Sequence, residues 1–227
     1  MIPNTFFRDA FAELSDEAQE QYHKTVFMHM QGAAAEKVRI EYYKPLFRDM
    51  GDNVTIGSGV KIVNPQNISL GNNVVISDNC TLYARSPKGI TLGDSTTLKP
   101  GVYLDTETED EGYIDIGERV YVGTGCCLQG HMGLEIGDDT LLAQNITITP
   151  FSHNFSDPKE LIIKQGGNSR KVTIGRDCYI GMNCCILYSA DVLEGSVVGS
   201  GSVVVHTIPS YSLAVGVPAK VIKKRGS

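Results

Sequence analysis

The sequence lacks any hydrophobic run that approaches the length of a membrane span. Its start carries acidic residues from position 9 onward and lacks the basic region and apolar stretch of a secretory signal. Positive charge is also scarce, because 20 Lys and Arg face 26 Asp and Glu for a net charge of −6, and the only basic cluster is at residues 223–225. These absences argue against a membrane-spanning protein or a nucleic-acid-binding surface, and we expect a cytoplasmic location.

The six cysteines are absent from the spacings that would give them a special role. None forms a Cys-x-x-Cys pair of the kind that binds zinc, and two adjacent pairs do not fit a secreted disulfide framework. We therefore expect reduced thiols at Cys80, Cys126, Cys127, Cys178, Cys184 and Cys185.

What the sequence does contain is a repeat. An aliphatic residue followed by Gly recurs along the chain, and a second aliphatic residue often follows six positions later. From Ile174 this period continues without a break through Ile180, Ile186, Val192 and Val198, so three hexapeptides take 18 residues. Short strands that each bury one aliphatic side chain and stack on one another form a parallel β-helix, and the period predicts that fold.

Two further positions of the hexapeptide fit this fold. The residue four places after each aliphatic is small or β-branched almost throughout, as expected for an inward position with less space. Four of the six cysteines occupy it, which favours a core role over catalytic thiols or metal ligands. The residues between are types that tolerate left-handed turn conformations, such as Asn72, Asp94, Asp138, Asn145 and Asn183.

The chain divides into two parts of different character. Residues 5–48 are rich in helix formers, with Gly32 and Pro45 as breakers, which predicts a helical cap over residues 1–50. Such a cap covers strand edges that an open coil would expose. The β-helix domain is predicted over residues 51–225.

Two intervals between repeats are too long for an 18-residue coil, so the excess must leave the helix as loops. The acidic stretch at residues 105–112 contains no apolar residue and predicts a solvated loop. The other interval, 38 residues from Ile136 to Ile174, contains the predicted loop 149–171, which is rich in apolar residues such as Ile163. Loops of this length are usually functional or disordered, and we expect this one to pack against a neighbouring subunit.

The segment at residues 142–153, LAQNITITPFSH, resembles the part of the maltose and galactoside O-acetyltransferases that carries their catalytic histidine. The phrases HNFSDP, QGG and VTIG and the ending GSGSVVVHTIPSYSLAVGVPAKVIKKR are similar to those of sugar O-acetyltransferases of polysaccharide clusters. The chain thus resembles the hexapeptide-repeat acyltransferases over roughly residues 50–225. This resemblance implies an all-β fold, a left-handed parallel β-helix with a helical N-terminal segment and a protruding loop, and a homotrimer with active sites between subunits.

The resemblance also implies a reaction, the transfer of an acetyl group from acetyl-CoA to a hydroxyl of a sugar, saccharide or nucleotide-sugar acceptor. A neutral alcohol is a poor nucleophile, so the reaction needs a base, and neutral imidazole with a pKa of about 6.5 suits that task. By resemblance the base is His153, and the backbone N–H of Met182 stabilises the oxyanion of the tetrahedral intermediate. A loop histidine with only a structural hydrogen bond is the other interpretation of His153.

Two residues are candidates for contact with the acceptor. Asn145 matches the acceptor-binding Asn of the family, but two other asparagines hold the same place in their hexapeptides, so a turn role explains it equally well. His131 lies 15 residues after its Ile-Gly phrase and His153 lies 17 after the next one, so the two should share a corner on successive coils. His131 is therefore either an acceptor-facing residue or a surface turn residue.

By resemblance, acetyl-CoA lies along the C-terminal coils with its phosphates near basic groups. The Thr-Lys expected before the turn is Val205-His206 here, and Tyr179 stands in place of the usual Trp. A solvated basic tail is the other interpretation of the C-terminal lysines. No metal is expected, and the predicted cofactor-binding residues are Gly199, Ser200, Gly201, Ser202, Lys220 and Lys223.

Three other functions remain open at this point. The same base chemistry serves N-acetylation, so an amino sugar is an alternative acceptor. The γ-class carbonic anhydrases share the left-handed β-helix but need three imidazoles on one zinc ion, and only His131 and His153 could approach each other. A non-catalytic β-helix would leave the apolar loop without an acceptor or CoA to serve.

Overall fold

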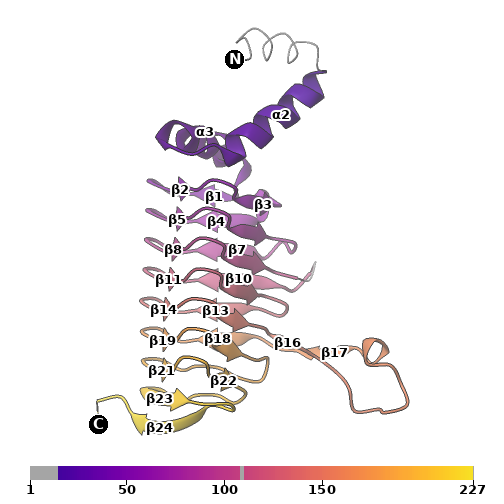
Figure 1. Ribbon diagram of the computed structural model, residues 1–227, viewed down its shortest axis with the longest axis vertical. Helices are drawn as coiled ribbons and strands as arrows, with labels where there is room; N and C mark the ends of the chain where they lie inside the picture. Colours follow the sequence, from indigo (N-terminus) through magenta and orange to yellow (C-terminus); the bar gives the residue numbers. More distant parts are fainter. Residues whose placement is uncertain (1–14, 108–109, 227) are drawn as a thin grey trace, which may run out of the picture.

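The computed structural model describes residues 15–107 and 110–226, so the predictions for residues 1–14 and 108–109 lie outside the described residues. The chain winds into a left-handed parallel β-helix, as the repeat and the resemblance together predicted (Figure 1). Three sheets, called A, B and C below, form its sides. A pair of helices covers its N-terminal end, and one long arm leaves its side.

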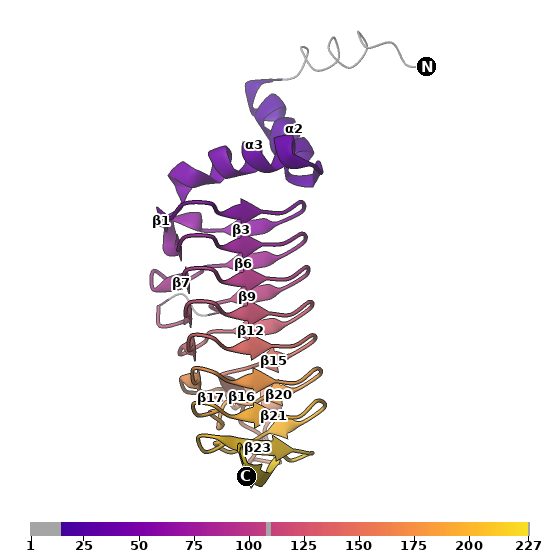
Figure 2. The same cartoon turned by 90° about the vertical axis from the view of Figure 1, so that its left-hand side faces the viewer.

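The strands of each sheet lie one above another along the axis (Figure 2). All neighbours are parallel except β24, which returns antiparallel to β23. Sheet A consists of β1 (Asp49–Met50), β4 (Ile68–Leu70), β7 (Gly89–Leu92), β10 (Tyr113–Ile116), β13 (Leu134–Ile136) and β18 (Val172–Ile174). Sheet B consists of β2 (Thr55–Ile56), β5 (Val75–Ile76), β8 (Thr97–Leu98), β11 (Tyr121–Val122), β14 (Leu141–Leu142), β19 (Tyr179–Ile180), β21 (Val197–Val198), β23 (Ser212–Val215) and β24 (Lys220–Lys224). Sheet C consists of β3 (Lys61–Val63), β6 (Thr81–Tyr83), β9 (Tyr103–Asp105), β12 (Cys127–Gln129), β15 (Thr147–Ile148), β20 (Cys185–Ile186) and β22 (Val203–Val204).

The turns between the sheets stack into columns at the corners of the prism. The column between sheets B and C, the BC corner, includes residues 123–126, 143–146, 181–184 and 199–202. The column between sheet C and sheet A of the next coil, the CA corner, includes residues 130–133, 149–171 and 187–191. Residues of one corner are therefore neighbours although they lie a coil or more apart in the sequence.

The predicted aliphatic residues fill the interior. Leu142 on sheet B and Ile148 on sheet C, for example, are fully buried. The small-residue positions also point inward, and the four cysteines assigned to them, Cys80, Cys126, Cys178 and Cys184, are buried as free thiols. A buried aliphatic side chain contributes about 1.5–3 kcal/mol, and because each row touches only the rows beside it, stability accumulates coil by coil.

Only two of the five predicted left-handed turn residues adopt that conformation, Asn145 with φ 56° and Asn183 with φ 57°. At the other three places the left-handed residue is the next one along, such as Asp139 with φ 60°. The predicted residue instead accepts an amide N–H from the preceding coil with its side-chain oxygen, as Asp138 does from Glu118 at 2.8 Å. The prediction was wrong by one position there because this ladder of side chains between coils is a tertiary contact.

The N-terminal cap consists of α2 (Asp16–His29), α3 (Ala33–Tyr43) and the 3-10 turn η1 (Lys44–Leu46), and a second turn, η2 (Pro65–Asn67), follows the first coil. Arg39 on α3 is buried, and its guanidinium donates to the carbonyl oxygens of Phe27 (2.9 Å), Met30 (2.7 Å) and Ile56 (2.9 Å). Since no coil precedes the first one, the bond to Ile56 satisfies a carbonyl at the open end of the solenoid. Neither described helix is long and apolar enough to cross a bilayer.

The arm, residues 149–171, interrupts the repeat where the long loop was predicted. It is built on an antiparallel hairpin of β16 (Phe151–His153) and β17 (Gly167–Ser169), with the 3-10 turn η3 (Ile162–Lys164) between them. Two ion pairs fasten its return to the solenoid, Arg170 with Asp191 at 3.1 Å and Lys171 with Glu135 at 2.9 Å. The arm therefore projects from the CA corner as an ordered element with a fixed root (Figure 1).

Candidate active site

His153 lies at the CA corner, at the end of β16. Its side chain is exposed, and its backbone pairs with Gly167 across the hairpin. The hairpin starts directly after the point where the Thr149 amide donates to the Ile186 carbonyl oxygen of the next coil at 3.0 Å. The predicted base is thus open to solvent and stands close to a root that is tied into the ladder of sheet C.

His131 occupies the same corner one coil earlier, in the turn between β12 and β13. The turn is tight, since the Gly133 amide donates to the Gly130 carbonyl oxygen at 2.9 Å. The His131 ring stacks on Phe151, with 4.9 Å between the ring centroids and 12° between the ring planes. The His153 ring meets the same Phe151 edge to face at 4.8 Å and 89°. Counting along the coils therefore predicted the shared corner, and Phe151 is the residue that joins the two histidines.

The electrostatics of this corner favour a neutral His131. Burial lowers the pKa of His131, and the carboxylates of Glu107 and Asp105 on the preceding coil oppose that shift without reversing it. Glu107 is held in place by the side chain of Gln129, which donates to Glu107 Oε1 at 2.9 Å. His131 thus stays mostly uncharged at neutral pH, beside the apolar ring of Phe151.

Asp105 corrects the prediction that residues 105–112 form only a solvated loop. It belongs to β9 and is buried, where Arg85 donates to it with two bonds of 2.8 and 3.0 Å and the Tyr103 hydroxyl donates at 2.7 Å. Burial alone would raise the pKa of Asp105, but the bonds from Arg85, Tyr103 and the Glu107 amide outweigh it, so the pKa lies below its usual value. The one sequence signal was the position of Arg85, 20 residues earlier and hence one coil away.

The other predicted site residues lie at the BC corner. Asn145, Met182 and Ser200 occupy successive coils of this column, and all three are exposed. Within the described residues the Met182 amide is not engaged in a hydrogen bond. Gly199 and Gly201 flank Ser200, and the terminal strand β24 pairs Lys220 with Val215 and Lys223 with Leu213.

Two of these residues have structural roles that compete with the predicted ones. Ser202 is fully buried, where its hydroxyl donates to the Gly199 carbonyl oxygen at 2.6 Å and accepts from the Gly216 amide at 3.0 Å. The Ser202 side chain therefore cannot line a surface groove, which corrects that prediction. Asn145 takes the left-handed turn conformation and lies against Gly125, where an added Cβ would meet Asn145 Oδ1 at 2.6 Å.

The predicted residues thus form two groups on two corners. His131 and His153 lie at the CA corner, whereas Asn145, Met182 and the Gly199–Gly201 turn lie at the BC corner, and sheet C stands between the groups. Neither group alone supplies both a base and an oxyanion donor. One chain therefore presents two halves of the predicted site on opposite edges of the same sheet.

A zinc site of the carbonic anhydrase kind does not form at this corner. Residues 15–107 and 110–226 contain no group of three His, Cys, Asp or Glu side chains placed to hold a metal ion. Between His131 and His153 the contact is made by the ring of Phe151, which has no metal-binding atom.

The sequence matches the family description "Hexapeptide repeat of succinyl-transferase" over residues 50–84, 74–106, 113–150 and 171–205. These segments together span more than half of the chain. The match breaks at residues 107–112 and 151–170, which are the acidic excursion and the arm. The family pattern thus covers the coils and omits the two segments that leave them.

Curated relatives carry acetyltransferase names. A probable acetyltransferase of Mycobacterium tuberculosis is 35% identical over 134 residues, which cover 59% of this chain and 42% of that protein. The galactoside O-acetyltransferase of Escherichia coli is 29% identical over 136 residues, 59% of this chain and 63% of that protein. A putative lipopolysaccharide biosynthesis O-acetyl transferase of Escherichia coli is 32% identical over 149 residues, with 63% and 75% covered. The match thus spans less than two thirds of the length of the first two relatives.

A similar solved structure is a variant of AntD, an N-acyltransferase from Bacillus cereus, in complex with dTDP and coenzyme A. It superposes with a TM-score of 0.58 and 26% sequence identity over 82% of this chain and 88% of that one.

Proposed function

Because the chain belongs to the hexapeptide-repeat acyltransferase family, we propose that it transfers an acetyl group from acetyl-CoA to a hydroxyl of a sugar, saccharide or nucleotide-sugar acceptor. The relatives named as O-acetyltransferases support this activity, and the AntD structure holds coenzyme A on a similar coil stack. The observation that carries the proposal is the arm, which interrupts the repeat and exposes His153 beside two supporting aromatic rings.

The imidazole of His153 takes the proton from the acceptor hydroxyl as its oxygen attacks the acetyl carbonyl carbon. The backbone N–H of Met182 donates to the oxyanion that develops on that carbonyl. When the tetrahedral intermediate collapses, the carbon–sulfur bond breaks, and the protonated His153 returns its proton to the departing thiolate. Proton and electron pairs balance within this sequence, so His153 ends neutral and ready for the next cycle.

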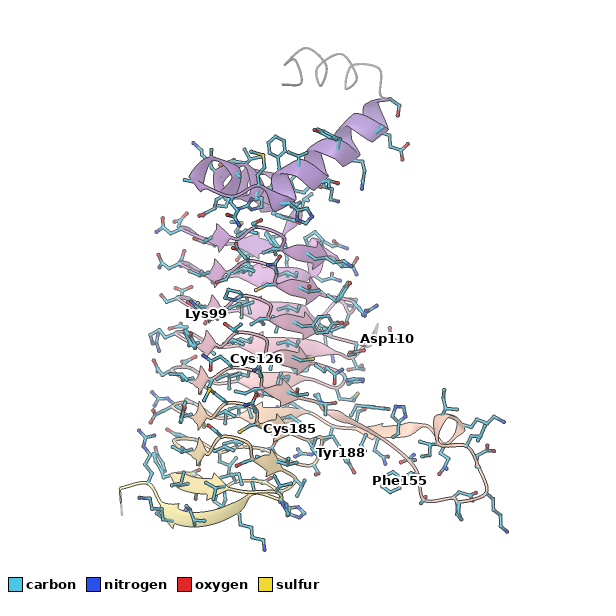
Figure 3. All side chains as sticks on the ribbon, in the orientation of Figure 1. Lys99, Asp110, Cys126, Phe155, Cys185 and Tyr188 are labelled. Carbon is cyan, nitrogen blue, oxygen red and sulfur yellow. The ribbon has the colours of Figure 1, made fainter. Side chains whose placement is uncertain are left out.

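We propose a homotrimer in which His153 of one copy meets the BC corner of the next. The separation of the two groups of site residues by sheet C supports this arrangement. The arm supports it as well, because Phe155, Leu161, Ile162 and Ile163 are 56–83% exposed and need apolar cover. Figure 3 shows Phe155 out on the arm, away from the stacked coils, where a second subunit would reach it.

The BC corner suits acetyl-CoA, the co-substrate that supplies the activated acetyl group. Gly199, Ser200 and Gly201 form a turn with little side-chain bulk, which lets a ligand approach the backbone closely. Lys220 and Lys223 on the exposed strand β24 are the basic groups nearest to this end of the column. We propose that they pair with phosphates of CoA, and that the reaction takes place in the cytoplasm, where acetyl-CoA is available and thiols stay reduced.

N-acetylation of an amino sugar is the second candidate function. The likeness to AntD, an N-acyltransferase, favours it specifically. An amine attacks the same carbonyl and gives up its proton to the same base, so the site geometry serves both reactions.

Release of free thiol from acetyl-CoA against a panel of sugars, amino sugars and nucleotide sugars tests the function. Wild type and His153→Ala are compared, with His29→Ala as the matched control because His29 is an exposed histidine on the distant cap. We expect acceptor-dependent release that falls by at least about a hundredfold in His153→Ala and stays unchanged in the control. Equal rates in all three proteins would remove His153 from the mechanism.

A further inference from the structure

Phe151 stands between the proposed base and a histidine of the preceding coil. Its ring stacks on His131 at 4.9 Å and 12° and meets His153 edge to face at 4.8 Å and 89°. We propose that Phe151 is the positioning residue of this site, which holds the His153 imidazole in its reactive orientation by linking the arm to the solenoid. This inference rests on the proposed function, because it assigns a role to Phe151 only if His153 is the base.

The position of the Phe151 ring is set from the solenoid side. His131 is part of a tight turn closed by the bond from the Gly133 amide to the Gly130 carbonyl oxygen. A ring that stacks on His131 therefore takes its place from the packed coils and not from the exposed hairpin. Stacked and edge-to-face aromatic pairs are each worth about 0.5–1.5 kcal/mol beyond their buried area.

The hairpin makes room for the Phe151 ring with a glycine. A Cβ atom at Gly167 would lie 2.2 Å from Phe151 Cζ and 2.5 Å from Cε2. Gly167 is also the residue that pairs with His153 across the hairpin. The Phe151 ring thus covers the backbone opposite the base, and this place has no space for a side chain.

An exposed histidine needs such support. The His153 side chain has two rotatable bonds and is open to solvent, so contact with Phe151 is what restrains its ring. Proton transfer requires the imidazole nitrogen to stand within about 2.6–3.2 Å of the acceptor hydroxyl. Misplacement of a catalytic group by about 1 Å can reduce the rate by about a hundredfold.

The kinetic test compares Phe151→Leu with Phe151→Tyr. Leucine keeps apolar bulk but removes the ring, and we expect kcat to fall by about ten- to a hundredfold with little change in the KM for acetyl-CoA. Tyrosine keeps the ring and should retain kcat to within about twofold. A residue that only stabilised the fold would lower the melting temperature and the amount of active protein, and would leave kcat per folded site unchanged.

Gly167→Ala provides a second route to the same result. The added methyl displaces the Phe151 ring, so this variant should lose activity as Phe151→Leu does. In the Phe151→Leu background most of that loss should disappear, because the ring is no longer there to be displaced. Full additivity of the two losses would contradict the positioning role.

The contact itself can be measured without activity. Proton NMR resolves the ring C–H signals of the five histidines, each assigned by its own His→Ala variant. Loss of the Phe151 ring should shift the signals of His131 and His153 together and leave those of the other three in place. Unmoved His131 and His153 signals in Phe151→Leu would overturn the proposal.

The failures of the two proposals are distinguishable. If His153→Ala is inactive and Phe151→Leu keeps the wild-type kcat, the base assignment stands and the positioning role is wrong. If His153→Ala keeps its activity, the proposed function fails at this residue, and the positioning role fails with it.

Discussion

Two variants that are each inactive should restore activity to one another when they share a trimer. His153→Ala removes the proposed base at the CA corner, and Ser200→Trp fills the BC corner where acetyl-CoA is proposed to lie. Sheet C separates these corners within one chain. A site shared between copies therefore takes its base from one subunit and its groove from the next.

The size of the recovery follows from the symmetry. A closed ring of three subunits has about three equivalent sites, one per interface. In a ring with two copies of one variant and one of the other, a single interface joins an intact His153 to an intact Ser200. Mixed trimers should therefore regain about one third of the wild-type kcat per trimer, with the KM of the wild type.

The assay needs a pure population of mixed trimers. The two variants are co-expressed with different affinity tags and purified over both, so that every particle contains each variant. Light scattering measures the mass of the particles, and thiol release measures their activity. Two differently tagged copies of His153→Ala, treated in the same way, form the control and should stay inactive.

A mixed trimer with no more activity than the two parent variants would refute the shared site, because every chain in it carries a defect. Full activity of the Ser200→Trp homotrimer would remove the BC corner from the acetyl-CoA site. A monomeric mass for the wild type would show that the arm does not join copies of the chain.

Three other predictions concern stability. Arg39→Leu should lower the free energy of unfolding by about 3–5 kcal/mol in urea titration, since it leaves three carbonyl oxygens at the cap without a donor, and a loss below about 1 kcal/mol would contradict the capping role. Asp105→Asn should cost about 1–2 kcal/mol at pH 7, because its partner Arg85 is 44% exposed and partly screened. Because the pKa of Asp105 is lowered in the folded state, this stabilisation is present above about pH 4 and is lost as the pH falls further, so wild type and variant should converge in acid and a constant difference would be the contrary result. Arg170→Leu, which removes the ion pair with Asp191, should speed proteolysis of the arm while global stability changes by about 1 kcal/mol or less, and an unchanged cleavage rate would show that the arm has another anchor.

The shared corner of the two histidines was within reach of sequence reasoning, because a coil of known length converts a residue count into a position. Phe151 was not, since an apolar residue in a loop has the same pattern whether it contacts a neighbouring subunit or two imidazoles. Asp105 was missed for a related reason. Its partner Arg85 stands 20 residues away, and only the stacking of coils brings the two charges together.

The sequence by itself determined the coils. Each hexapeptide buries its own aliphatic residue and touches only the coils beside it, so the inward and outward positions follow from the local period. Tertiary structure alone decided where the chemistry lies. It placed His153 and Met182 on corners separated by sheet C, and it set Phe151 against His131 and His153. These relations depend on how coils stack and how the arm leaves them, and contacts between distant segments leave no period in the sequence.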